Sequence, residues 1–200
     1  MTKRLIIGAG RMRLSVCLAS ALVLLTAAGC GSLYKVKPVV EAPLPGTASD
    51  VEAGGLRLRA APLLTDEESQ ELFEANLPLA GLLPIKVEIT NQGSAPVEIK
   101  RARLGLRDAE GRQWKLRSVK DVVSRVLSSD KVTLYNPRSR AEFEAAMRAY
   151  ALDVRTPLAP SERRQGLLFF QTPKKEQVSG PRGLVLSVEK LQQPLEVRLN

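Results

Sequence analysis

The chemistry open to this chain is limited by a complete lack of histidine and by a cysteine count of two, Cys17 and Cys30. Without histidine, a Ser-His-Asp triad, an imidazole proton relay and a His-ligated zinc site are all excluded. Two thiols are too few for a disulfide scaffold or a four-thiolate metal site. Catalysis would have to rest on Asp, Glu, Ser, Lys or Tyr, and we expect neither a cofactor nor a bound metal.

Two polar clusters look like reactive groups but have simpler interpretations. Ser128-Ser129-Asp130-Lys131 fits the S-x-x-K pattern of penicillin-binding enzymes, yet the S-D-N and K-T-G elements that accompany it are missing. Four acids also lie close together, at Asp66, Glu67, Glu68 and Glu71. They fit the first turn of a helix, where the macrodipole favours carboxylates without any metal. We therefore predict that the chain is not an enzyme. A pair of carboxylates brought together by folding is the alternative that the sequence leaves open.

Residues 1–29 have the layout of an export signal. They carry no acid and four basic residues, Lys3, Arg4, Arg11 and Arg13, and a mostly apolar run follows over 14–28. This run has 15 residues. A membrane-spanning helix needs about 20 apolar residues, so we predict a signal peptide instead. Its basic part is long for such a signal, and translation starts either at Met1 or at Met12.

The apolar run ends in Leu25-Thr26-Ala27-Ala28-Gly29-Cys30. This segment resembles the lipobox of bacterial lipoproteins, and the resemblance covers these few positions only. It implies that Cys30 is diacylated on sulfur and becomes the mature N-terminus. The segment departs from the family at Ala27, where leucine is usual. An ordinary secretory cleavage site is the alternative, since the small residues Thr26 and Ala28 also satisfy that pattern.

Processing at Cys30 would place the protein in a bacterial cell envelope, lipid-anchored to a membrane and facing the periplasm, with the outer membrane favoured over the inner. It would also remove Cys17 and four basic residues, which lowers the net charge from +9 to +5. The remaining charge is weak support for a polyanionic partner. Nucleic acid is not expected as a partner, because export takes the chain away from it and only 4% of the residues are aromatic.

The composition divides the rest of the chain into a tether and one domain. Residues 30–54 contain several prolines and glycines and predict a lipidated cysteine with a flexible tether. Residues 55–200 are enough for one core without disulfides. Within them, seven segments show the alternation or the short apolar runs typical of strands. They lie near residues 56–59, 85–90, 96–106, 114–116, 166–171, 184–188 and 195–199.

Three helices are predicted between these strands. Thr65 with Glu68 and Ser139 with Glu142 form capping boxes, and Ser118 can cap a helix over 119–127. The second and third helices lie together in an insertion at about 118–152.

The pattern as a whole predicts a mainly β fold, an antiparallel immunoglobulin-like β-sandwich with helical insertions. Residues 83–91 and 158–170 have the look of strand segments in such domains. In these patterns the region 55–200 resembles uncharacterised envelope lipoproteins with a domain of this kind. That resemblance implies a fold and no activity.

A basic surface is the main candidate for binding. Arg101, Arg103 and Arg107 alternate with apolar residues before a predicted hairpin turn over 108–111, so we expect them to project together, opposite Leu104 and Leu106. We call these three residues the arginine ridge. Lys100, Arg112, Lys115 and Arg117 are expected nearby. The ridge either binds an anionic surface or an acidic protein patch, or it is a solvated face that protects a sheet edge.

These observations favour a non-enzymatic envelope lipoprotein whose domain binds a protein partner or organises an assembly. A lipid- or glycan-binding module of the periplasm is the alternative. The two differ in one structural feature. A deep apolar pocket lined by Phe143, Met147 and Tyr150 would support ligand binding, whereas a filled insertion would weaken it.

Overall fold

The computed structural model describes residues 44, 47–132 and 139–199. Cys30 and the rest of 1–43 lie outside these residues, so the signal peptide and the lipid anchor stay predictions. Eight strands are described: β1 (Ser49–Ala53), β2 (Leu56–Pro62), β3 (Leu82–Asn91), β4 (Arg103–Arg107), β5 (Gln113–Leu116), β6 (Arg163–Gln171), β7 (Val185–Glu189) and β8 (Leu195–Arg198). The helices are α2 (Asp66–Phe73), α3 (Val119–Leu127) and α4 (Arg140–Tyr150), with short 3-10 turns η1 (Pro78–Ala80) and η2 (Ile99–Arg101).

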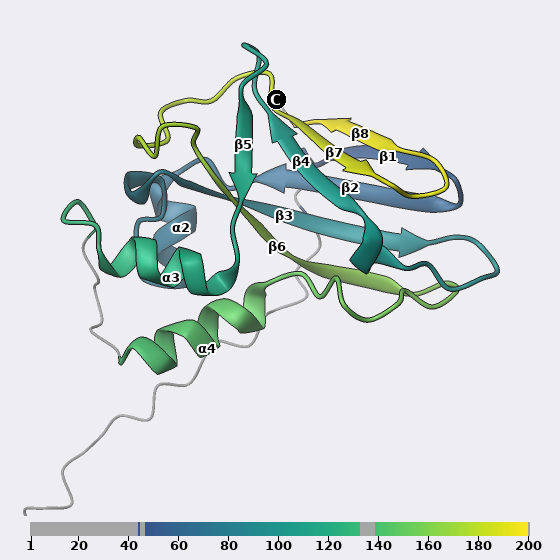
Figure 1. Ribbon diagram of the computed structural model, residues 1–200, viewed down its shortest axis with the longest axis horizontal. Coiled ribbons are helices and arrows are strands. Elements are labelled where there is room, and N and C mark those ends of the chain that lie inside the picture. The colour runs from purple at the N-terminus through teal and green to yellow at the C-terminus, as the bar shows by residue number, and fades with distance from the viewer. Residues whose placement is uncertain (1–43, 45–46, 133–138, 200) are drawn as a thin grey trace, which may run out of the picture. The chain divides into compact units, whose positions relative to one another are not determined.

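All strand pairs are antiparallel, and the strands follow the order β1-β2-β3-β6-β5-β4-β7-β8. The mainly β, antiparallel fold with helices is therefore confirmed. Strand β5 joins the two halves of the sheet: its first residues pair with β4 and its last two, Lys115 and Leu116, pair with β6. The end strands β1 and β8 lie close to each other, so the sheet is nearly barrel-like (Figure 1).

The sheet encloses a core between its two halves. Leu58, Ile85 and Phe170 enter it from β2, β3 and β6, and Leu106 and Leu186 enter it from β4 and β7. All five side chains are at most 1% exposed, which is what alternation along half-buried strands produces. The regular alternation of β3 therefore indicated correctly which residues point inward.

A second core covers the other face of β3 and β6. Leu82 of β3 and Phe169 of β6 point into it, and α2, α3 and α4 supply the opposite wall (Figure 1). Phe73 of α2 meets Tyr150 of α4 edge to face, with ring centroids 5.7 Å apart. Strands β3 and β6 are thus buried on both faces.

The predicted helix starts are confirmed at the level of single hydrogen bonds. Thr65 accepts a bond from the backbone N–H of Glu68, whose carboxylate accepts one from the backbone N–H of Thr65. Ser139 and Glu142 repeat this reciprocal arrangement at α4. Ser118 caps α3, and α3 and α4 fall inside the expected insertion at 118–152.

Two sequence expectations need correction. Strand β1 lies inside the segment 30–54 that we expected to be a tether, and Asp50 and Glu52 on its polar face pair with Arg57 of β2. The polar residues of β1 have the composition of a linker, and only their pairing with Arg57 shows that they belong to a strand. The expected strand over 96–106 is shorter: the chain makes one bridge at Val97, then the turn η2, and β4 begins at Arg103.

Candidate functional site

The arginine ridge is exposed, but it is not a single row. Arg103 and Arg107 lie on β4 and alternate with the more buried Leu104 and Leu106, as expected. Arg101 belongs to the turn η2 that precedes the strand. It lines a separate cavity of about 270 Å³, next to the loop between β7 and β8. The strand therefore presents two of the three arginines together.

The outer face of β4, β7 and β8 carries charges of both signs. Arg103 lies directly opposite Glu189 of β7. Arg107 Nη2 is 3.1 Å from Glu196 Oε2 of β8, an exposed ion pair. Arg198 of β8 adds another exposed cation. Because each arginine of β4 has a carboxylate neighbour, this face is a mixed-charge surface and not the uniformly basic one that the sequence suggested.

Two other cations expected near the ridge lie elsewhere. Arg112 turns to the hairpin and pairs with Asp108, their Nε and Oδ2 atoms 2.8 Å apart. Arg117 donates to Gln171 Oε1 of β6, with Nε at 2.9 Å. Lys115 stays exposed on β5.

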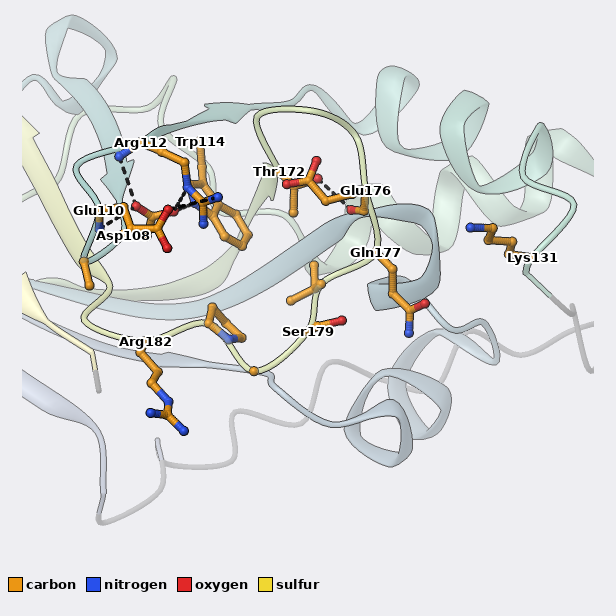
Figure 2. A pocket seen from close by; sticks show the side chains of 14 residues that line it. Asp108, Glu110, Arg112, Trp114, Lys131, Thr172, Glu176, Gln177, Ser179 and Arg182 are labelled. Atoms are coloured by element: carbon orange, nitrogen blue, oxygen red, sulfur yellow. Dashed lines mark hydrogen bonds and ion pairs between the residues drawn. The ribbon is translucent and has the colours of Figure 1, made fainter.

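A cavity lies between the β4–β5 hairpin and the loop 172–183. Its volume is about 640 Å³. Figure 2 shows Arg112 and Trp114 converging on Asp108 at one end of it, whereas Arg182 points away. Three acids and three bases line the cavity, namely Asp108, Glu110, Glu176, Arg112, Lys131 and Arg182. Such a balanced lining does not favour a strongly charged ligand.

Asp108 is fully occupied by the hairpin itself. Its Oδ1 accepts backbone N–H bonds from Glu110 (3.1 Å) and Arg112 (3.0 Å). Its Oδ2 accepts from Arg112 Nε (2.8 Å) and from the indole N–H of Trp114 (3.1 Å). The Asp108 side chain is 4% exposed, so these four bonds replace water. The carboxylate closes the turn and anchors the chain's single tryptophan.

These bonds also decide the charge of Asp108. Burial by itself would raise the pKa of this carboxyl, but the hydrogen bonds from Trp114 and Arg112 outweigh it and hold the pKa below its usual value. A general base needs a pKa near the working pH and an oxygen free to take a proton. Asp108 has neither, so its role is structural.

The structure shows where three of the other polar groups singled out in the sequence lie. Ser128 ends α3, and its hydroxyl donates to the carbonyl oxygen of Arg125 at 3.2 Å. Lys131 lines the far side of the large cavity, and Figure 2 shows it apart from Asp108. Glu68 serves the N-terminus of α2. Among the described residues, no group of three or more Cys, Asp or Glu side chains gathers where it could hold a metal ion.

The pocket that would have supported ligand binding is filled. Phe143, Met147 and Tyr150 of α4 are 3%, 1% and 6% exposed, and all three pack in the core between the helices and the sheet. Their side chains occupy the space that an apolar ligand would need.

Sequence reasoning recognised 108–111 as a turn but missed the four hydrogen bonds that Asp108 accepts. It also missed a second pair of arginines, Arg117 and Arg125, near α3. An aspartate at the start of a tight turn, followed by Arg112 and Trp114, was the available signal for these hydrogen bonds. No local pattern in the sequence indicated that Arg117 and Arg125 line the same cavity.

Comparison with known proteins gives no functional name. No family model matches the chain, and no curated protein matches it. Among solved structures, the chain is similar to a conserved hypothetical protein from Bacillus anthracis, with 9% identity and a TM-score of 0.37. That similarity covers 74% of this chain and 92% of the other. Within the described residues, no helix is long and apolar enough to cross a membrane.

Proposed function

We propose that the chain is a non-enzymatic lipoprotein of a bacterial cell envelope, anchored through Cys30 and facing the periplasm, whose β domain binds a protein partner. The observation that favours a protein partner over a lipid or glycan is the filled layer between the helices and the sheet. Because Phe143, Met147 and Tyr150 already occupy that layer, binding falls to the outer surface.

The mixed-charge face of β4, β7 and β8 is the surface that we assign to this partner. Arginines beside Glu189 and Glu196 suit a partner that carries both signs of charge. A uniformly anionic surface would be attracted to the arginines and repelled by the two glutamates. Complementary charges of this kind mainly set specificity and the rate of association.

For the fold, we propose the immunoglobulin-like β-sandwich as the finer classification. Its support is the facing of two antiparallel halves across one core, with Leu58 and Phe170 on one side and Leu106 and Leu186 on the other. The passage of β5 between the halves is a departure from separate sheets.

The anchor is tested by Cys30→Ser, with Cys17→Ser as the matched control. Each buried methylene contributes about 0.8 kcal/mol, and stable attachment needs more than one acyl chain. We expect Cys30→Ser to abolish labelling by radioactive palmitate and to release the protein into the soluble periplasmic fraction. The control should keep both the label and the membrane fraction. Labelling that persists in Cys30→Ser would refute the lipid anchor.

The partner surface is tested by a photo-crosslinking residue at Glu189, on the proposed face, or at Lys120 of α3, away from it. We expect a discrete protein adduct from position 189 only. The double change Arg103→Glu and Arg107→Glu should abolish this adduct, whereas Arg155→Glu in an exposed loop should not. Equal adducts from positions 189 and 120 would contradict the assignment. So would an adduct from position 189 that persists when Arg103 and Arg107 are both changed to Glu.

A further inference from the structure

Five arginines of the described residues are half-buried: Arg57, Arg59, Arg117, Arg125 and Arg164. Three of these pair with carboxylates, on Asp50, Glu88 and Glu162. Arg117 and Arg125 have no carboxylate within ion-pair distance among the residues that the structure describes. This difference separates them from the other half-buried arginines, since a charge withdrawn from water is normally matched by an opposite one.

Neutral oxygens hold both guanidinium groups in place. Arg117 donates to Gln171 Oε1 through Nε (2.9 Å) and Nη2 (2.5 Å). Arg125 donates through Nε to the carbonyl oxygen of Ala80 and through Nη2 to that of Lys175, both at 2.9 Å. A guanidinium carries five N–H donors. Each arginine is therefore held in place by two of its donors. Its positive charge and its remaining N–H donors can then interact with a bound anion.

The two arginines line the same small cavity. It has a volume of about 270 Å³ and lies between α3, the end of β6 and the loop that follows it. Lys175 and the hydroxyl-bearing Ser124 also line it, and Arg140 of α4 donates to Ser124 Oγ at 2.7 Å. One carboxylate, Asp121, belongs to the lining and accepts a hydrogen bond from Ser118 Oγ at 3.0 Å. The lining keeps an excess of positive charge.

We propose that this cavity is an anion-binding site for a phosphate group. Planar guanidinium groups match the oxygens of phosphate, and rigid donors lose little freedom on binding. The volume is at the small end of ligand sites, which suits a single phosphate group and not a large organic ligand. The site is formed by Arg117, Arg125 and Lys175, on a different part of the surface from the arginine ridge, and it does not depend on the proposed protein partner.

The test is a calorimetric titration of the full chain in detergent with inorganic phosphate, at constant ionic strength set with chloride. Arg117→Met should weaken phosphate binding by about tenfold, the loss expected for a hydrogen bond to a charged group. Lys175→Gln removes an exposed charge without touching a described side-chain bond, and should weaken it by roughly two- to fivefold. Arg155→Gln changes the net charge equally, outside the cavity, and should leave binding unchanged.

A fourth variant separates a binding site from arginines that only brace the fold. Asp121→Asn keeps an oxygen for Ser118 and removes the one carboxylate of the lining, so phosphate should bind roughly two- to fivefold more tightly. A purely structural role for Arg117 and Arg125 predicts no such gain. The proposal is overturned if Asp121→Asn leaves affinity unchanged or weakens it, or if Arg117→Met, shown to be folded by circular dichroism, binds phosphate like Arg155→Gln.

Two further titrations identify the source of the phosphate. Glycerol 3-phosphate presents a monoester, and glycerophosphoglycerol presents the diester of an anionic lipid headgroup. If glycerol 3-phosphate binds more tightly than glycerophosphoglycerol, the site is assigned to a soluble phosphate ester. Binding of the diester at least as tight as that of inorganic phosphate assigns it to a lipid headgroup. If neither compound competes with inorganic phosphate, the site does not take phosphate groups of either source and the proposal fails.

Discussion

Replacing Asp108 should destabilise the domain by an amount that depends on pH. Asp108→Ala removes the acceptor of four hydrogen bonds and leaves the buried indole N–H of Trp114 without a partner. A buried donor left unpaired costs about 1–3 kcal/mol, and bonds to a charged group contribute about 1.5–3 kcal/mol each. The Arg112 side chain is 47% exposed, so water replaces its bond at little cost. We expect a loss of about 2–4 kcal/mol in the free energy of unfolding at pH 7.

Asp108→Asn isolates the charge, since it keeps the shape and one oxygen acceptor. Its cost at pH 7 should be about 1–2 kcal/mol. The pKa of Asp108 is lowered in the folded protein, so its contribution is complete above the unfolded pKa of about 3.9 and is lost as pH falls through the folded value. The difference in stability between wild type and Asp108→Asn should therefore stay nearly constant from pH 7 down to about 5, and shrink as pH falls further through the unfolded pKa and the folded pKa.

The measurement is urea denaturation at a series of pH values, followed by circular dichroism and by the fluorescence of Trp114, the only tryptophan. Asp130→Asn is the control, because Asp130 is an exposed aspartate of a loop. It should change stability by less than about 0.5 kcal/mol at every pH. A difference between wild type and Asp108→Asn that stays constant as pH falls below about 4 would refute the role given to the charge.

Three substitutions test the packing and the helix caps by the same denaturation method. Met147→Ala should cost about 2–5 kcal/mol, because the side chain is 1% exposed in the core under α4, and a loss below 1 kcal/mol would contradict the filled layer. Gly166→Ala should cost about 1–3 kcal/mol or prevent folding, since an added Cβ would lie 2.4 Å from the Cα of Leu152. Wild-type stability there would mean that the segment after α4, at Leu152, does not approach β6 so closely. Ser139→Ala should cost about 1 kcal/mol by removing the α4 cap, against no more than about 0.5 kcal/mol for Ala145→Ser on the exposed face.

Local features of the chain were predicted well where neighbouring residues are enough to define them. A capping box needs only a serine or threonine and a glutamate three residues on, which is why Thr65 and Ser139 marked the starts of α2 and α4. The two-residue alternation of β3 also needs no distant information, since successive side chains of a strand point to opposite faces.

Features that depend on a distant partner were missed or misplaced. Strand β1 was missed although its partner is near: the acid Asp50 has linker composition, and Arg57 of the neighbouring strand is seven residues further on. The ridge appeared uniformly basic because Glu189 and Glu196 lie more than 80 residues away in the chain, although the strand register sets them next to Arg103 and Arg107. Register between distant strands is fixed by the packing of the whole core and not by any single segment.

The sequence by itself was enough to identify the mainly β fold class and the starts of the helices, and to predict an export signal. Each of these depends on residues a few positions apart. Only the tertiary structure decided the strand order, the filling of the space under α4 and the meeting of Arg117, Arg125 and Lys175. The last of these joins a strand end, a helix and a loop about 50 residues further on. Contacts of that range exist only once the chain has closed its loops and buried its core, which is a property of the whole fold.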